Sequence, residues 1–239
     1  MGAALRQDHK GMCGTALHEC YRRGNGTTRN FRNRTSARDA LNMFSDISAF
    51  SISEFHDSCL AESGWSKLRT AQFNQGIWQY IEINHRHNCL LWDEEDLARR
   101  KDVADNHIAQ NKRAIDDFNQ RRNDAIEHID ETLLQRLSGV TRHGNARLNS
   151  ETAGAMMDRL SILSLKIFHM RLQTERKEVE PTHIAACQRK LARLIEQRID
   201  LQACLNRLLQ EAATGDAYFK IYRQFKMYND PSLNPCLYK

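Results

Sequence analysis

The chain has 239 residues, of which 41% are hydrophobic and 27% are charged. This composition is typical of a globular protein and excludes a disordered one. Only three prolines and eleven glycines occur in this length, which argues against an all-β sandwich or barrel, because those folds need many tight turns. No stretch approaches about 18 consecutive apolar residues and no charged-then-apolar leader opens the chain, so we expect neither a membrane span nor a signal peptide.

The net charge of +5 is concentrated near the N-terminus. Residues 1–50 contain eight Arg or Lys against four Asp or Glu, so this segment carries +4 and the remainder carries +1. A basic segment can neutralise nucleic-acid phosphates or an anionic membrane surface, but stacking aromatic residues are scarce here. We therefore expect residues 1–46 to form a flexible, solvated extension and residues 47–239 to form the folded domain. Nucleic acid is not the expected partner.

The seven cysteines are an odd number, widely scattered, and include no CxxC pair. Structural zinc sites need closely spaced ligand pairs, and disulfide scaffolds need a high density of cysteine. We therefore predict no metal site and a reducing, cytoplasmic compartment.

From Ile47 onward the hydrophobic spacing predicts an all-α bundle of about five to six helices. The predicted helices cover residues 51–68, 73–101, 105–137, 151–178, 181–213 and 216–228. The Gly, Ser and Asn residues of segment 138–150 predict a loop, and residues 229–235 should be extended. Ser150 or Thr152 offers an N-cap to the helix that follows, and Pro181 suits a first helical turn.

Polar side chains interrupt the apolar faces of several predicted helices. In helix 73–101, at about 100° per residue, one face gathers His85, Asn88, Trp92, Glu95, Asp96 and Arg99. Arg122 lies at the centre of the apolar stripe of helix 105–137, and Arg198 has the same position in helix 181–213. Because an unpaired arginine is costly in a core, both residues predict facing carboxylates. The candidate partners are Glu95, Asp96, Asp130 and Asp158.

Three interpretations of these polar stripes stay open. The side chains form a structural network of ion pairs, line a ligand pocket between helices, or extend their charged ends into solvent. If they line a pocket, its carboxylates could act as general acids or bases. A buried polar and ionic cluster between helices is therefore part of the predicted fold.

The sequence lacks the common catalytic motifs, including HExxH, Walker A, GxSxG and GxGxxG. A diiron carboxylate bundle needs an ExxH pair in each of two helices, whereas only Glu82–His85 lies inside a predicted helix. The sequence therefore identifies no cofactor and leaves open whether the protein is an enzyme.

Five segments carry a resemblance to a known family. They are NHRHNCLLWDEEDLARR, IDDFNQRRNDAIEHIDETLL, ETAGAMMDRLSILSLKIFHM, EQRIDLQACLNRLL and YRQFKMYNDPSLNP. Over about Ile47 to Tyr238 the chain resembles a bacterial family of uncharacterised helical proteins, domain of unknown function 4254. The family pattern begins near Met43, which makes residues 1–42 look like an extension. It also has a His where this chain has Asp93, so a ligand or proton-carrier role of that His would be impaired here.

The resemblance implies no established activity, but similar members often accompany glycosyltransferase genes of cell-envelope polysaccharide synthesis. Its motifs include the polar stripes and add further residues, among them Asn84, Lys166, Arg223 and Lys226. The leading hypothesis is an inter-helical pocket for an anionic, phosphorylated or sugar-nucleotide-like ligand, linked to envelope polysaccharide synthesis. The alternative is a non-catalytic adaptor that docks a partner enzyme of the glycosyltransferase pathway, with a purely structural polar network.

The candidate site residues follow from the stripes and the resemblance together. The candidate catalytic residues are His85, Glu95, Asp96 and Asp158. The candidate ligand-binding residues are Asn84, Asn88, Trp92, Arg99, Asn119, Arg122, Asn123, Asp130, Arg198, Arg223 and Lys226.

Overall fold

The computed structural model describes residues 42–223, 232–233 and 236. Its helices are α2 (Ala49–Ala61), α3 (Trp65–Leu68), α4 (Gly76–Leu97), α5 (Asp105–Arg136), α6 (Ala153–Thr174) and α7 (Pro181–Thr214). The short strands β1 (Arg147–Leu148) and β2 (Ala217–Tyr218) pair in parallel. Our expectations for residues 1–41, for Lys226 and for most of the C-terminal tail fall outside the described residues.

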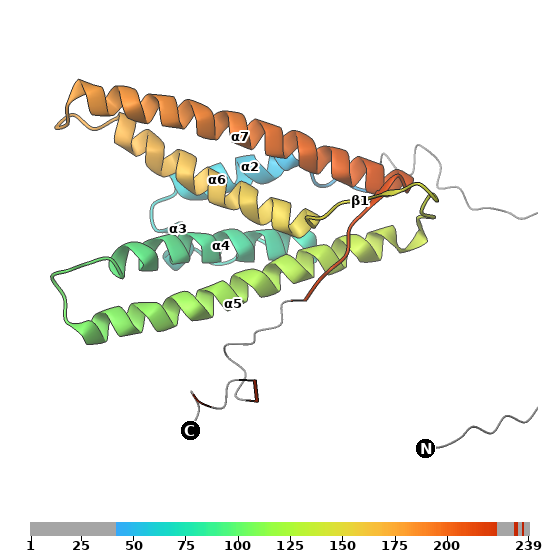
Figure 1. Ribbon diagram of the computed structural model, residues 1–239, viewed down its shortest axis with the longest axis horizontal. Helices are drawn as coiled ribbons and strands as arrows, with labels where there is room; N and C mark the ends of the chain where they lie inside the picture. The colour runs from blue at the N-terminus through green and yellow to red at the C-terminus, as the bar shows by residue number, and fades with distance from the viewer. Residues whose placement is uncertain (1–41, 224–231, 234–235, 237–239) are drawn as a thin grey trace, which may run out of the picture. The chain divides into compact units, whose positions relative to one another are not determined.

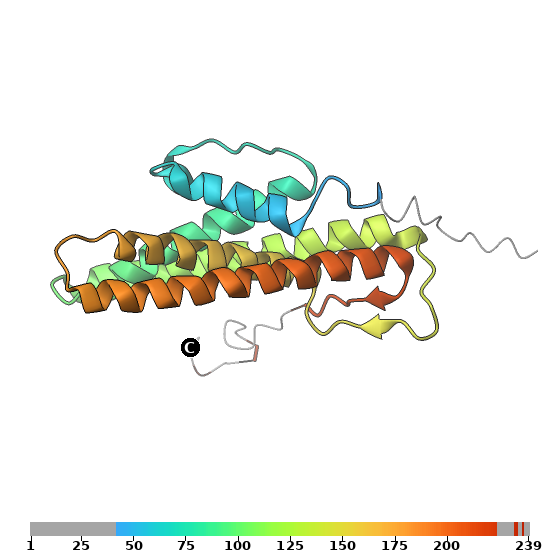
Figure 2. The same cartoon turned by 90° about the horizontal axis from the view of Figure 1, so that it is seen from above.

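The helices pack as two neighbouring pairs with α2 against one of them. In Figures 1 and 2, α4 lies beside α5 and α6 lies beside α7, while α2 packs on α6 and α7. Each long helix places fully buried apolar side chains in one shared core, for example Ile52, Ile81, Ile129, Leu160 and Leu205. The predicted all-α bundle of five to six helices is confirmed.

Local sequence features begin and end several helices as predicted. The Thr152 hydroxyl accepts the Ala155 amide at 3.1 Å and caps α6, and Pro181 occupies the first turn of α7. The single helix predicted over residues 51–68 is instead two helices. The helical path is interrupted because Glu62 is extended after α2 and Gly64, with a left-handed φ of 73°, precedes α3.

The helix predicted over residues 216–228 is wrong over its described part. Gly215, with φ of 83°, terminates α7, and residues 217–218 form β2. From there to Arg223 the chain is not helical. Ala217 and Phe219 are buried, Tyr218 between them is half-buried, and Lys220 is exposed. Burial at every second residue is typical of a strand. In so short a segment, this alternation is difficult to distinguish in the sequence from the spacing of a helical turn.

Residues just before α2 pack with the bundle. Phe44 and Ile47 are buried in the core, and the Asp46 carboxylate pairs with Arg136 at 2.6 Å. The Asp46 carbonyl also accepts the Trp78 indole N–H at 3.1 Å.

Among the described residues, no helix combines the length and the apolar character needed to cross a membrane.

Candidate functional site

A cavity of about 460 Å³ opens between α4, α5 and α6, and we call it the arginine cavity. It is lined by Asn88, Leu91, Trp92, Glu95, Asp96, Arg99, Asn119, Arg122, Ile162 and Leu165. Most of the polar face predicted for helix 73–101 borders this cavity, together with Asn119 and Arg122 from α5. Helical spacing explains the α4 contribution, because residues three and four apart share a face.

Both arginines of this cavity already lie close to carboxylates. Arg99 pairs with Glu95 at 3.0 Å and with Asp96 at 3.6 Å, and Arg122 Nε lies 3.9 Å from Asp158 Oδ1. Arg122 Nε is buried and finds no hydrogen-bond acceptor among the described residues. The cavity therefore presents balanced charge, with one guanidinium donor unused.

Three other candidates lie behind the cavity wall in a buried hydrogen-bond network. Asp158 Oδ1 accepts the side-chain amides of Asn84 and Asn88, each at 2.9 Å. Asn88 also donates to the Ser161 hydroxyl at 3.0 Å, which lies 2.8 Å from His85 Nδ1. Asn84, His85 and Asp158 thus do not line the arginine cavity, and they hold Asn88 in place. Burial lowers the pKa of His85 to about 3, so its ring is neutral.

The structure adds a histidine that the sequence reasoning missed. His56 of α2 stacks on His85 with ring centroids 4.3 Å apart, and both rings are fully buried. Neither ring nitrogen of His56 has a hydrogen-bond partner among the described residues. Burial holds the pKa of His56 well below its ordinary value, and the nearby His85 and Arg198 lower it further. Only its place on the buried face of α2 could have indicated it.

Arg198 belongs to another part of the bundle. Its guanidinium donates to both carboxylate oxygens of Asp57 at 2.8 and 2.9 Å and lies 3.4 Å from the Ser164 hydroxyl. Its predicted carboxylate partner is real, but it is Asp57 rather than any of the four candidate acids. The reason is tertiary: α2 packs on α7, and the sequence does not show which helices are neighbours.

Three more candidates also lie elsewhere. Asn123 and Asp130 line a separate cavity of about 370 Å³ together with Thr152. Asp130 accepts the Gly154 amide at 2.7 Å at the start of α6, and burial raises the pKa of its carboxyl to about 6. Arg223 is exposed and pairs with Glu131 at 2.9 Å.

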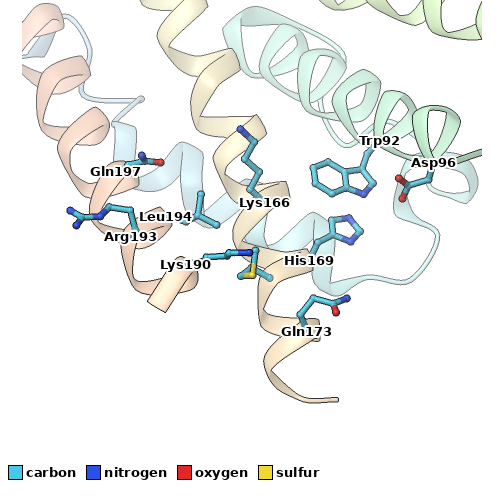
Figure 3. A pocket seen from close by; sticks show the side chains of 10 residues that line it. Trp92, Asp96, Lys166, His169, Gln173, Lys190, Arg193, Leu194 and Gln197 are labelled. Carbon is cyan, nitrogen blue, oxygen red and sulfur yellow. The ribbon is translucent and has the colours of Figure 1, made fainter. Parts of the chain in front are cut away.

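A second cavity, of about 610 Å³, lies between α4, α6 and α7, and we call it the lysine cavity. It is lined by Trp92, Asp96, Lys166, His169, Met170, Gln173, Lys190, Arg193, Leu194 and Gln197 (Figure 3). Trp92 and Asp96 line both cavities, so the two cavities meet at these side chains.

The Trp92 ring is fixed where the cavities meet. It stacks on His169 with centroids 4.3 Å apart and an interplanar angle of 5°. Burial lowers the pKa of His169, which favours its neutral form. His169, Lys190 and Arg193 are not among the predicted site residues. Lys190 and Arg193 lie on an exposed face of α7, where the sequence pattern gives no sign of a site.

Glu82 and Arg86 have a structural role that was also missed. The buried Glu82 carboxylate accepts the backbone amides of Gln72 and Phe73 and pairs with Arg86 at 2.9 Å. Arg86 in turn donates to three carbonyls of residues 65–69 and lies 4.4 Å from the Trp65 ring centroid. The Glu82–Arg86 pair therefore anchors the chain before α4. No group of three or more His, Cys, Asp or Glu within the described ranges is arranged to hold a metal ion.

A comparison with family models places this molecule. The family described as "Protein of unknown function (DUF4254)" matches residues 78–221, more than half of the chain. The chain therefore belongs to this family, and the matched region, from α4 to just beyond β2, contains the lining residues of both cavities. No curated protein and no solved structure matches the chain.

Asp93, where the resemblance led us to expect a His, lies outside the lining of both cavities. Its carboxylate pairs with Lys67 at 2.8 Å, and it is absent from the lining of either cavity. Asp93 is therefore not part of the wall of either cavity.

Proposed function

We propose that this protein binds a small phosphorylated or sugar-nucleotide-like molecule at the arginine cavity, as part of cell-envelope polysaccharide synthesis. One observation carries the proposal: guanidinium, carboxylate, amide and indole groups of α4 and α5 border a single cavity, to which α6 adds apolar side chains. Ligand sites in helical bundles have this composition, with few polar groups that converge on a partly apolar space.

The cavity reaches from solvent into the bundle. The Arg99 side chain is 67% exposed, whereas that of Arg122 is 25% exposed. The buried network of Asn84, Asn88 and Asp158 holds the inner wall, so a ligand would meet groups that are already oriented. Of the candidate catalytic residues, Glu95 and Asp96 border the cavity, and a reaction at this site would use these carboxylates.

The test is a thermal-shift screen of the full chain against nucleotides, sugar nucleotides and sugar phosphates. A ligand at 100 times its Kd should stabilise the fold by about 2.7 kcal/mol. Calorimetric titration of the best compound should then show a loss of affinity of about tenfold or more in Arg122→Gln.

Arg121→Gln is the matched control, because Arg121 lies on the same helix, is exposed and pairs with Asp117. It should change the affinity less than about twofold. If no compound of the panel stabilises the protein, or if both variants bind equally well, the ligand-binding function is wrong and the adaptor hypothesis takes its place.

A further inference from the structure

The lysine cavity carries positive charge that nothing described in the protein neutralises. Lys166 and Lys190 form no ion pair or hydrogen bond with any residue in the described part of the chain. Arg193 pairs with Glu196 at 2.7 Å, and Asp96 is the acidic residue that lines this cavity. By contrast, each arginine of the arginine cavity lies within 4 Å of a carboxylate.

The two cavities therefore suit different chemical groups. Unpaired ammonium groups at the edge of a partly apolar cavity favour a phosphate. Guanidinium, carboxylate and amide groups side by side offer both donors and acceptors, which is what hydroxyl groups need. Asp96 lines both cavities, but the arginine cavity has Glu95 in addition, whereas the lysine cavity sets Asp96 against the two unpaired lysines, so an anionic group is favoured there.

Trp92 joins the two cavities. In Figure 3 its ring lies against that of His169, with Asp96 on one side and Lys166 on the other. Because the stack with His169 fixes the indole, it offers a rigid apolar surface at the point where a ligand would cross from one cavity to the other.

We propose that the two cavities form one bipartite site for a glycosyl phosphate: the phosphate binds Lys166 and Lys190, and the hydroxyl-rich sugar enters the arginine cavity past Trp92. This inference rests on the proposed function and deepens it. It assigns the recognition of charge to the lysine cavity and the recognition of the sugar to the arginine cavity.

The experiment compares two probes by calorimetric titration of the full chain. Inorganic pyrophosphate carries the charge without the sugar, and UDP-glucose carries both. The double variant Lys166→Gln/Lys190→Gln should weaken binding of both probes about tenfold or more, because each lysine is a charge-assisted donor. Arg122→Gln should weaken binding of UDP-glucose about tenfold and change that of pyrophosphate less than about twofold.

A matched double variant controls for net charge. Lys112→Gln/Lys220→Gln removes two exposed lysines that line neither cavity, and it should leave both affinities within about twofold of the wild type. The lysine variants change exposed side chains, so the fold should be retained.

The outcomes separate the two proposals. If pyrophosphate binding is lost in Arg122→Gln and kept in Lys166→Gln/Lys190→Gln, charge is recognised in the arginine cavity: the proposed function stands and the bipartite site is wrong. If neither probe binds while another compound of the screening panel does, the bipartite site alone is wrong. If no phosphorylated compound binds at all, both proposals fail.

Discussion

Two stacked histidines lie at the centre of the bundle without charge. His56 and His85 are both fully buried. The Ser161 hydroxyl lies within hydrogen-bond distance of His85, whereas neither ring nitrogen of His56 has a partner among the described residues. Burial lowers the pKa of both imidazoles, to about 3 for His85. In the unfolded chain the same groups titrate near pH 6.5. The fold therefore excludes a proton that the unfolded chain accepts.

This difference predicts acid lability. Since the folded pKa values are lowered, the stabilisation is complete above about pH 6.5 and is lost as the pH falls toward 3, because the unfolded state gains protons first. Between pH 7.5 and 5.5 the two groups together should lower the free energy of unfolding by about 2.7 kcal/mol. Urea denaturation at the two pH values measures it.

A variant with one buried histidine fewer sharpens this test. His56→Phe should roughly halve the pH dependence, whereas His107→Gln, at an exposed position, should leave it unchanged. An unfolding free energy that stays constant between the two pH values would show that the buried rings are not the source of the effect.

At the scale of the elements, the packing of α6 against α5 depends on a glycine. A Cβ atom at Gly154 of α6 would lie 2.7 Å from the Ile126 carbonyl of α5 and 2.9 Å from Asp130. The Gly154 amide also donates to Asp130 at 2.7 Å. The absence of a side chain therefore lets the carboxylate approach the first turn of α6.

Gly154→Ala should consequently destabilise the protein by about 1–3 kcal/mol, since the obstacle is backbone and cannot rotate away. Chemical denaturation of the variant measures the loss. Gly139→Ala is the control, because a Cβ at Gly139 meets nothing within 4 Å. Its stability should stay within about 0.5 kcal/mol of the wild type, and an equally small change in Gly154→Ala would contradict the steric argument.

For the whole molecule, contacts near the N-terminal end of the described residues decide where the folded domain begins. The basic composition of residues 1–50 and the loss of helical pattern before Ile47 predict an extension that does not stabilise the bundle. Phe44, however, is buried in the core. Asp46 forms an ion pair with Arg136, and its carbonyl accepts a hydrogen bond from the Trp78 indole. Stabilising contacts therefore precede Ile47.

Two truncations locate the boundary. A chain that starts at Met43 should unfold within about 4 °C of the full chain. A chain that starts at Ile47 should lose about 2 kcal/mol or more, because it lacks the buried Phe44 side chain and the contacts of Asp46. Differential scanning calorimetry of both chains measures this, and a large loss in the Met43 chain would show that the extension stabilises the bundle.

Local features were predictable because they depend on neighbours in the sequence. The helix predicted over residues 105–137 is α5, Asp105–Arg136, and Thr152 and Pro181 mark the helix starts that their chemistry favours. The face shared by Trp92, Glu95 and Arg99 was equally accessible, since it follows from the helical repeat alone. Such features require no knowledge of how the helices pack.

The tertiary structure decided which of these faces meet. It pairs Arg198 with Asp57, stacks Trp92 on His169, and places Asp130 in a cavity apart from Arg122. It also pairs residues 217–218 with 147–148 as strands where a helix was predicted. These contacts join residues far apart in the chain, and their energies depend on which helices are neighbours and at what depth they cross. The 3.6-residue repeat of a single helix determines neither its neighbouring helices nor the depth at which they cross.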